Sequence, residues 1–311
     1  MTIKGSGSLS MTEINAEFGR GNDLNAYRNT QWYTDGGSSG TFSSGQISIN
    51  EFYNKRGSLP RPRTIELLIV AGGGCGGGGG IFGTGGGGGG GVIITTINLV
   101  GSGVSVGVGY GGRPNNGYRG GDSWFGDIRA YGGGNGQWPV INIKSSWGGS
   151  GGGGGGNNLN FVIGGDGVVG QGFRGGGNYG PTYINFGAGG GGAGGPGTDI
   201  TNVNLYTRTY SGGQPGPGRY SDILGYGAVF GAGGAGQGGK LTNVRDGVNE
   251  RGEGGSGGTY YTNLAGRDTG YGGSGLVVAR YLGPQSYSGG NSIYGWNGYT
   301  IHVFTTGGTF T

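Results

Sequence analysis

The residues able to do chemistry in this 311-residue chain are few and stand apart from one another. His302 is the only histidine and Cys75 the only cysteine, so a His/Cys metal site and an intrachain disulfide are both excluded. His302 lies in the alternating sequence YTIHVF, which is typical of a strand histidine rather than a general base. Asp246, Glu250 and Glu253 could mimic a glycosidase pair, but a solvated loop explains them more simply. We therefore expect no enzyme, no metal and no other cofactor.

One glycine motif has the spacing of a phosphate-binding loop. The sequence GAGQGGKL at 234–241 matches that loop as far as Lys240. Leu241, however, stands where Ser or Thr would have to reach a magnesium ion, and the following TNVRDGVN is a poor helix. Such motifs also arise by chance in a chain with 94 glycines. The motif does not predict nucleotide binding.

Aromatic side chains are more informative, since the chain has 19 Tyr, 11 Phe and 5 Trp. We expect one group of them to cap or fill the fold, namely Phe125, Tyr131, Phe161, Phe173 and Tyr281. Another group lies in long polar loops beside basic residues, a composition typical of binding hot spots. The candidate binding residues are Trp138, Ile141, Trp147, Tyr206, Arg208, Tyr210, Lys240 and Arg245. Packing within the loops and contacts between subunits are the alternative roles.

The elements that must position these loops are glycine runs and short apolar stretches. The glycine runs include 72–80, 85–91, 148–156, 187–197, 231–239 and 252–258. Strand-like sequences rich in β-branched and aromatic residues occupy 65–71, 92–99, 276–281 and 299–304. Collagen is excluded because glycine does not recur at every third position and there are only 9 prolines. A flexible linker would lack the apolar stretches.

Packed together, the glycine runs could form an array of extended helices. Most runs have about 5–10 residues, which span roughly 15–30 Å at a rise of about 3.1 Å per residue. Without Cβ atoms, neighbouring runs can approach closely and hydrogen-bond through their backbones. If the runs alternate in direction, the loops at 137–147, 198–210 and 240–251 fall at one end and those at 178–186 and 259–269 at the other.

The first 63 residues differ in composition from the rest, and the sequence PRPR at 60–63 marks the change. This segment contains a diverged repeat, GSLSMTEINAEFG at 7–19 and GQISINEFYNKR at 45–56. Ser10 followed by Glu13 predicts a helix capping box in the first copy. The candidate attachment residues of this segment are Ile14, Phe18, Trp32, Ile49, Phe52 and Tyr53. So small a core is not expected to support an independent fold.

The charged residues and the start of the chain limit partners and location. Lys and Arg exceed Asp and Glu by 19 to 15, and they are scattered, which argues against nucleic acid as the main partner. No stretch reaches the ~20 apolar residues of a membrane helix, and MTIKGSGSLSMTEIN lacks the apolar core of a signal peptide. We expect synthesis in a cytoplasm, delivery by assembly and no membrane insertion.

The order of these segments resembles the glycine-rich domain of phage tail proteins, including tail-fibre tip adhesins of T-even-like phages. The matching sequences are IELLIVAGGGCGGGGG, SVGVGYGG, DSWFGDIRAYGGG, GGDGVVGQGFRGGG, GAGGGGAGG and GYGGSGLVVARY. The two N-terminal repeats likewise resemble the short element at the front of many phage virion proteins. The resemblance implies a mainly irregular/β fold, a polyglycine-II helical sandwich with flanking short β-strands and a small mixed N-terminal attachment segment. The implied domains are 1–63 for attachment, 64–282 for the sandwich and 283–311 for a C-terminal strand or hairpin extension.

The resemblance also implies a function in the phage virion. The leading expectation is an adhesin that binds a host outer-surface receptor, protein or glycan, through the candidate loop residues, while residues 1–63 dock onto a fibre or baseplate protein. A structural tail component that joins or decorates fibres without touching the host is the alternative. An ice-binding glycine bundle is a third hypothesis, which the irregular aromatic loops disfavour. Both a homotrimer and a single copy on a trimeric fibre end are compatible with this family.

Overall fold

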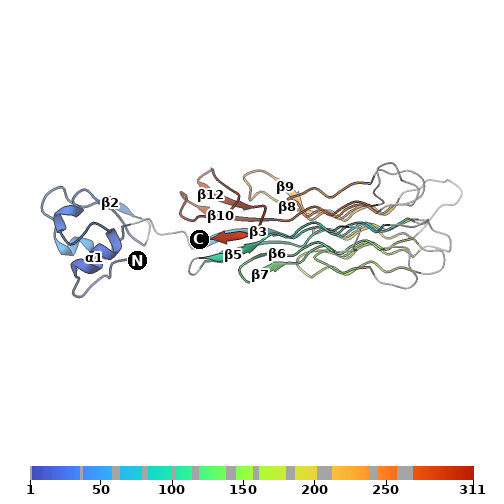
Figure 1. Ribbon diagram of the computed structural model, residues 1–311, viewed down its shortest axis with the longest axis horizontal. Coiled ribbons are helices and arrows are strands. Elements are labelled where there is room, and N and C mark those ends of the chain that lie inside the picture. Colours follow the sequence, from blue (N-terminus) through green and yellow to red (C-terminus); the bar gives the residue numbers. More distant parts are fainter. Residues whose placement is uncertain are drawn as a thin grey trace. The chain divides into compact units, whose positions relative to one another are not determined.

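The computed structural model divides the chain into two compact units, Met1–Pro62 and Arg63–Thr311, and Figure 1 labels their elements. The structure describes residues 2–35, 38–57, 64–78, 83–99, 103–113, 119–137, 145–156, 161–179, 186–201, 212–237, 244–257 and 269–311. In this part of the chain the fold is mainly β and irregular, with helical residues confined to the first unit.

The first unit contains two capped helical turns that arise from the two copies of the repeat. Its elements are α1 (Met11–Phe18), η1 (Leu24–Tyr27), β1 (Gln31–Tyr33), β2 (Ser39–Thr41) and η2 (Ile49–Phe52). The predicted capping box at α1 is confirmed, since the Ser10 hydroxyl accepts the Glu13 N–H and the Glu13 carboxylate accepts the Ser10 N–H. Ser48 and Glu51 form the same reciprocal pair at η2.

The first unit has a hydrophobic core that includes more residues than the two repeats supply. Its buried side chains are Ile3, Ile14, Tyr27, Phe42, Ile47 and Phe52. The rings of Phe42 and Phe52 lie 4.3 Å apart, and Phe18 meets Phe52 edge-on at 5.6 Å. Tyr27 and Phe42, which lie between the two copies of the repeat, complete the core that the repeats begin.

The second unit contains a five-stranded antiparallel sheet in the order β11-β12-β10-β3-β4. Its strands are β3 (Thr64–Val70), β4 (Val92–Asn98), β10 (Leu276–Leu282), β11 (Ser292–Trp296) and β12 (Tyr299–Phe304). The four predicted strand-like stretches thus form four of these strands. β11 and β12, which belong to the expected C-terminal extension 283–311, pair within this sheet, so that segment is part of the second unit.

The second unit also contains two smaller sheets, which together with the five-stranded sheet we call the strand region. The four-stranded sheet has the order β13-β5-β6-β7, with β5 (Val104–Gly107), β6 (Ser123–Phe125), β7 (Ile128–Ala130) and β13 (Gly308–Phe310). The pair β8 (Arg219–Ser221) and β9 (Ala228–Phe230) forms the third. Alternate residues of β3 enter different clusters: Leu67 packs with Phe125 and Phe310, whereas Leu68 packs with Phe230. Side-chain packing therefore covers both faces of the large sheet.

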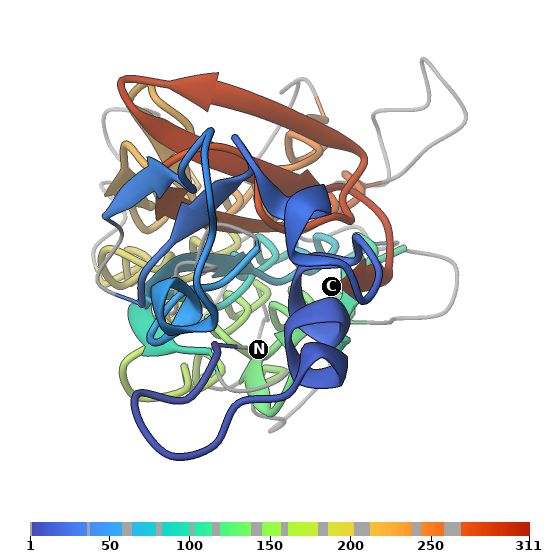
Figure 2. The same ribbon diagram turned by 90° about the vertical axis from the view of Figure 1, so that its left-hand side faces the viewer.

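The glycine runs extend from the strands and lie side by side (Figures 1 and 2). The central run, 85–91, hydrogen-bonds through its backbone with a period of three residues. Gly85, Gly88 and Gly91 donate to residues of 131–137, Gly86 and Gly89 to 188–191, and Gly87 and Gly90 to 252–255, at 2.7 to 3.2 Å. Its carbonyls accept from 71–77, 150–153 and Gly234. We call this network of backbone hydrogen bonds the glycine lattice.

Close approach of the runs explains why they consist of glycine. A Cβ on Gly86 would stand 2.0 Å from the Gly234 carbonyl oxygen, and one on Gly88 would stand 2.2 Å from the Ser150 carbonyl oxygen. Neither neighbour can give way, since each is backbone held in the lattice. Residues 71–78 and 83–92 are consequently buried although they carry almost no side-chain atoms.

Candidate functional site

The chain segments that flank the long loops meet at one end of the glycine lattice. Tyr179 donates its N–H to the Ile200 carbonyl at 2.8 Å, and Gly187 donates to the Gln237 carbonyl at 2.5 Å. Gln237 in turn donates to the Thr84 carbonyl at 3.1 Å. Bonds of this kind connect the residues flanking 79–82, 138–144, 180–185, 202–211, 238–243 and 258–268. The two sets of loops that alternating runs would separate therefore emerge at the same end.

The alternation argument fails because several short turns reverse the chain at the strand end. The stretch 240–251 illustrates this, since it is not one loop. Its residues 244–247 run within the lattice, where Gly247 donates to the Tyr271 carbonyl at 2.8 Å. A turn with Glu250 in the left-handed region, at a φ of 63°, then leads back through Gly252. Because one such turn between two loops reverses the chain, both loops begin at the same end of the lattice.

Two of the eight candidate binding residues, Trp147 and Arg245, lie in the described part of the chain. The other six, which are Trp138, Ile141, Tyr206, Arg208, Tyr210 and Lys240, lie outside the described residues. Arg245 is exposed, and its backbone is fixed in the lattice because its N–H donates to the Ser256 hydroxyl at 2.8 Å. Trp147 follows the segment 138–144, and Arg119 and Tyr131 lie next to it.

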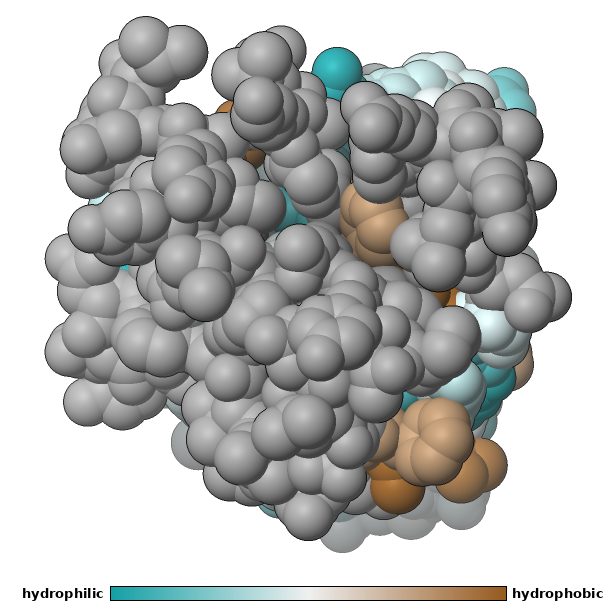
Figure 3. Space-filling model, turned by 90° about the vertical axis from the view of Figure 1, so that its right-hand side faces the viewer, coloured by the Kyte–Doolittle hydropathy of each residue, from teal (hydrophilic) through white to brown (hydrophobic). Residues whose placement is uncertain are grey.

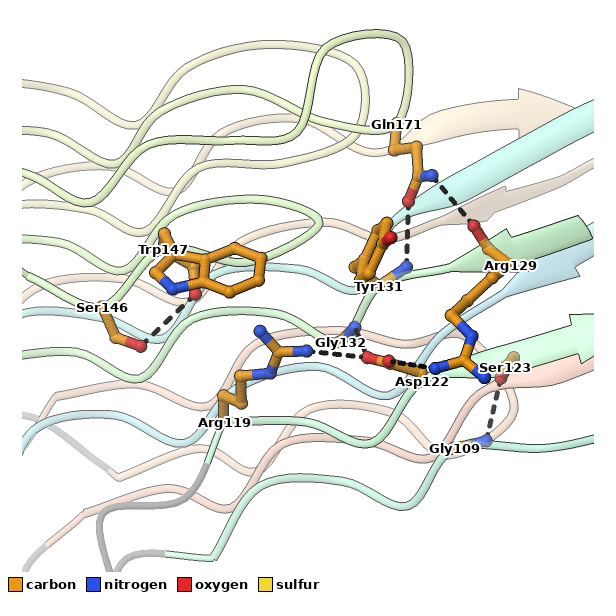
Figure 4. A network of polar contacts seen from close by, with 10 residues as sticks. All are labelled: Gly109, Arg119, Asp122, Ser123, Arg129, Tyr131, Gly132, Ser146, Trp147 and Gln171. Atoms are coloured by element: carbon orange, nitrogen blue, oxygen red, sulfur yellow. Dashed lines mark hydrogen bonds and ion pairs between the residues drawn. The ribbon is translucent and has the colours of Figure 1, made fainter.

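Trp147 lies on the flank of the lattice and is 53% exposed. The guanidinium carbon of Arg119 stands 4.4 Å from the centre of the indole, a cation–π distance. The ring of Tyr131 lies 6.2 Å from that of Trp147. Figure 4 shows these three side chains converging from three separate segments. We call Arg119, Asp122, Tyr131 and Trp147 the flank cluster.

Asp122 organises the flank cluster. Its carboxylate pairs with Arg119 at 2.9 Å and with Arg129 at 3.5 Å, and it also accepts the N–H of Gly132 at 2.9 Å (Figure 4). These contacts hold the Arg119 guanidinium over the indole. The cluster therefore presents a supported aromatic ring and the oriented guanidinium of Arg119, a combination typical of binding hot spots.

A second ion pair stabilises the loop end. Arg174 binds Asp199 through both terminal nitrogens, at 2.7 and 2.9 Å, and Asp199 also accepts the Gly177 N–H at 2.7 Å. The hydrogen bond from Arg174 is the main cause that lowers the pKa of Asp199 below its usual value. This pair connects the segment that enters one loop at Tyr179 to the segment that enters another at Thr201.

The aromatic residues expected to cap the fold divide into two groups. Phe125 and Tyr281 are confirmed as core residues, being 2% and 1% exposed, and Tyr131 is partly buried. Phe161 and Phe173 were wrongly predicted, since they are 65% and 47% exposed. They differ because a lattice run presents side chains outward unless a strand or another run covers that side. Figure 3 faces the loop end and shows apolar described residues (brown) reaching the surface there.

The candidate attachment residues lie in and around the core of the first unit. Ile14 and Phe52 are fully buried, whereas Phe18, Trp32 and Ile49 pack against that core from partly exposed positions. Tyr53 is also partly exposed and donates its hydroxyl to the Gly7 carbonyl. Sequence reasoning missed Lys55, whose ammonium stands 4.1 Å from the centre of the Trp32 ring, because nothing in the sequence pattern brings these two residues together.

His302 and Cys75 are both buried in the second unit. His302 is buried, and its Nδ1 lies 2.7 Å from the Gly289 carbonyl and its Nε2 3.1 Å from the Tyr281 hydroxyl. Burial lowers the pKa of His302 and raises the pKa of the Cys75 thiol to about 11. Among the described residues, no three His, Cys, Asp or Glu side chains gather as metal ligands, and no helix is long and apolar enough to span a membrane.

Comparison with known proteins gives a family and no individual relative. No curated protein and no solved structure matches the chain. A family model described as "Glycine-rich domain" matches residues 53–282, which is more than half of the chain and covers the whole glycine lattice. The chain therefore belongs to the Glycine-rich domain family.

Proposed function

We propose that this protein is a phage tail-fibre or tail-tip adhesin that binds a host-surface receptor through the loops at one end of its glycine lattice, and that it is not an enzyme. One observation carries the proposal: the flanks of six loops gather at one end and are hydrogen-bonded to one another. Loops anchored in this way lose less freedom on binding, which favours affinity. The resemblance of the ordered glycine segments to phage tail proteins supplies the biological setting, a virion.

The lattice itself supports a polyglycine-II sandwich. A polyproline-II-type helix has three residues per turn and no internal hydrogen bonds. The described run 85–91 supports such a helix in two ways: its donors point to three neighbouring segments in turn, and the hydrogen-bond partners of its backbone lie in other segments. We infer that the runs are polyglycine-II helices, stacked so that each turn bonds to its neighbours.

We assign attachment to the virion to the first unit. Trp32 and Tyr53 are the candidates for direct contact with a fibre or baseplate protein, because they are partly exposed. Ile14 and Phe52 support that surface from the core. The receptor loops and the flank cluster then belong to the second unit.

Adsorption competition tests the proposal. Purified full-length protein added to host cells before the phage should coat the cells and reduce adsorption of the phage. Replacing the loops 138–144, 202–211 and 238–243 with those of a related phage of different host range should transfer the host range. Asp127→Asn, at an exposed position of the strand-end turn between β6 and β7, serves as the matched control and should leave adsorption unchanged.

Two results would contradict the adhesin proposal. The first is that the protein neither coats host cells nor blocks adsorption, and the second is that the loop exchanges leave host range unaltered. If a reconstruction of the particle also found the loop end buried against a neighbouring tail protein, the structural component that joins or decorates fibres would replace the adhesin.

A further inference from the structure

Buried polar side chains in the glycine lattice are concentrated at the end where the loops emerge. With the exception of Ser150, each one that the structure describes outside the strands lies within two residues of one of the segments 79–82, 138–144, 180–185, 238–243 and 258–268. They are Thr84, Gln137, Ser145, Asn178, Gln237, Ser256 and Thr269. The middle of the lattice is held together without such side chains, because its runs bond to one another through their backbones.

The hydroxyls of two buried threonines each donate to a backbone carbonyl on the other side of a loop. Thr84 donates to Gly77, and Thr269 donates to Ser256 at 3.2 Å. The loops bridged in this way are 79–82 and 258–268. Each hydrogen bond therefore joins the chain that enters a loop to the chain that leaves it.

Ser145 and Asn178 bridge two further loops, 138–144 and 180–185. The Ser145 hydroxyl lies 3.0 Å from Oε1 of Gln137 and 3.0 Å from the Gly153 carbonyl oxygen. The Asn178 amide donates to the Phe186 carbonyl at 3.0 Å. Breaking such a bond would leave a buried polar group without a partner, so the two ends of each loop are held at a fixed separation. We call Thr84, Ser145, Asn178 and Thr269 the clasp residues.

We propose that the clasp residues are positioning residues of the receptor-binding end and that they set the rate at which the protein dissociates from its receptor. This inference rests on the proposed receptor function. A loop whose two ends are fixed has less freedom to lose on binding, and differences in affinity within one interface lie mostly in the dissociation rate. The clasp residues act without touching the receptor, because each is 6% exposed or less.

The matched pair Thr269→Val and Thr300→Val separates positioning from a purely structural role. Both substitutions remove a buried hydroxyl that donates to a backbone carbonyl, but Thr300 lies at the strand end, where its hydroxyl donates to the Gly283 carbonyl at 2.7 Å. Labelled full-length protein is bound to cells of the host bacterium, and its dissociation is followed well below the melting temperature. Thr269→Val should dissociate about tenfold or more faster than the wild type, and Thr300→Val within about twofold of it.

Amide exchange of the free protein gives a second readout that needs no receptor. The N–H of Gly270 donates to the Ser256 carbonyl at 2.9 Å, beside the hydroxyl of Thr269. In Thr269→Val this amide should exchange about tenfold or more faster than in the wild type, because the base of the loop opens more often. The amide of Gly88, in the central run, should exchange at the same rate in both proteins.

The proposal is overturned if the wild type binds host cells and Thr269→Val dissociates at the same rate, or if Gly270 exchanges equally fast in both proteins. Failure of the wild type to bind host cells at all would instead overturn the proposed function, and the clasp residues would lose their role in binding with it.

If Thr269→Val fails to fold, Ser145→Ala replaces it, with Ser150→Ala as its control. Ser150 is also buried, but its hydroxyl has no hydrogen-bond partner among the described residues. Ser145→Ala should then dissociate faster than the wild type and Ser150→Ala should not. Equal dissociation rates of these two variants would overturn the proposal.

Discussion

The first unit and the glycine lattice of the second unit both have a buried interior, but different atoms fill it. In the first unit, rings such as Phe42 and Phe52 exclude water and fill the interior. In the lattice the buried atoms are backbone, and the N–H groups of residues 85–91 each find a carbonyl in a neighbouring run. The comparison teaches that a chain can be packed without large side chains, provided that its backbone groups are paired.

The two structures differ in how they respond to substitution. A side-chain core can relax around a smaller residue, and it then loses transfer free energy and gains a cavity. The lattice has no side chains to move, since the atoms nearest each glycine are carbonyls of the adjacent runs. Adding one carbon to the lattice should therefore cost at least as much as removing a whole ring from the core.

The largest effect is expected from Gly86→Ala. Its Cβ would stand 2.0 Å from the Gly234 carbonyl oxygen, so two runs must separate and their hydrogen bonds break. We expect the free energy of unfolding of the second unit to fall by more than about 3 kcal/mol. Denaturant unfolding measures this change. Ala235→Ser is the matched control, because Ala235 is a partly exposed position of the same lattice and should tolerate a hydroxyl.

Phe52→Ala should have a comparable but slightly smaller effect, confined to the first unit. The ring is fully buried and contacts Phe18, Tyr27 and Phe42. Its removal should destabilise this unit by about 3 kcal/mol. Differential scanning calorimetry should show the transition of the first unit shifted and that of the second unit unchanged. Asn50→Ala, at an exposed position in η2, should shift neither. Equal shifts of both transitions after Phe52→Ala would contradict the separation of the two cores.

A smaller effect is expected from pH, through His302 in the strand region. Tyr281 accepts the N–H groups of Ser286 and Tyr287 and so donates its own proton to Nε2 of His302, which keeps the imidazole neutral. Burial lowers the pKa of His302 in the folded protein, so the unfolded chain takes up a proton first as the pH falls below about 6.5. Stability should therefore be full above that pH and decrease below it.

Melting temperatures between pH 7.5 and 5 measure this dependence. His302→Gln should be less stable than the wild type at pH 7.5, because the buried hydrogen bonds are disturbed, but its melting temperature should change less with pH. The window ends at pH 5 because the lowered pKa values of Glu13, about 2, and Asp199 place the titration of these carboxylates below it. An equal slope in the two proteins would assign the effect to other groups.

The sequence predicts the parts of the molecule that depend on local pattern. The apolar stretches at 65–71 and 276–281 form β3 and β10, and Ser10 with Glu13 forms the capping box, because neighbouring residues suffice to specify them. The flank cluster could not be predicted, since Arg119 and Trp147 meet only through the packing of separate runs.

The sequence likewise does not predict which positions of the lattice are exposed and which are buried. Whether Phe161 or Phe125 is covered depends on which strand or run lies beside it, and a glycine run carries no side-chain pattern that names its neighbours. The sequence also could not predict at which end of the lattice each loop lies, because one short turn, such as that at Glu250, reverses the direction of every later run. The period of three in the hydrogen bonds becomes visible only once the neighbours are known.

Hydrogen–deuterium exchange of the glycine amides tests the lattice most directly. Uniformly labelled protein, with amides resolved by NMR, would report Gly74, Gly77 and Gly85 to Gly91 beside the strand amides of β3 and β10. Because these glycine N–H groups donate to buried carbonyls, they should exchange as slowly as the amides of Leu67 and Val278. Exchange of Gly85 to Gly91 at the rate of an unstructured glycine peptide, while β3 and β10 stay protected, would contradict the lattice.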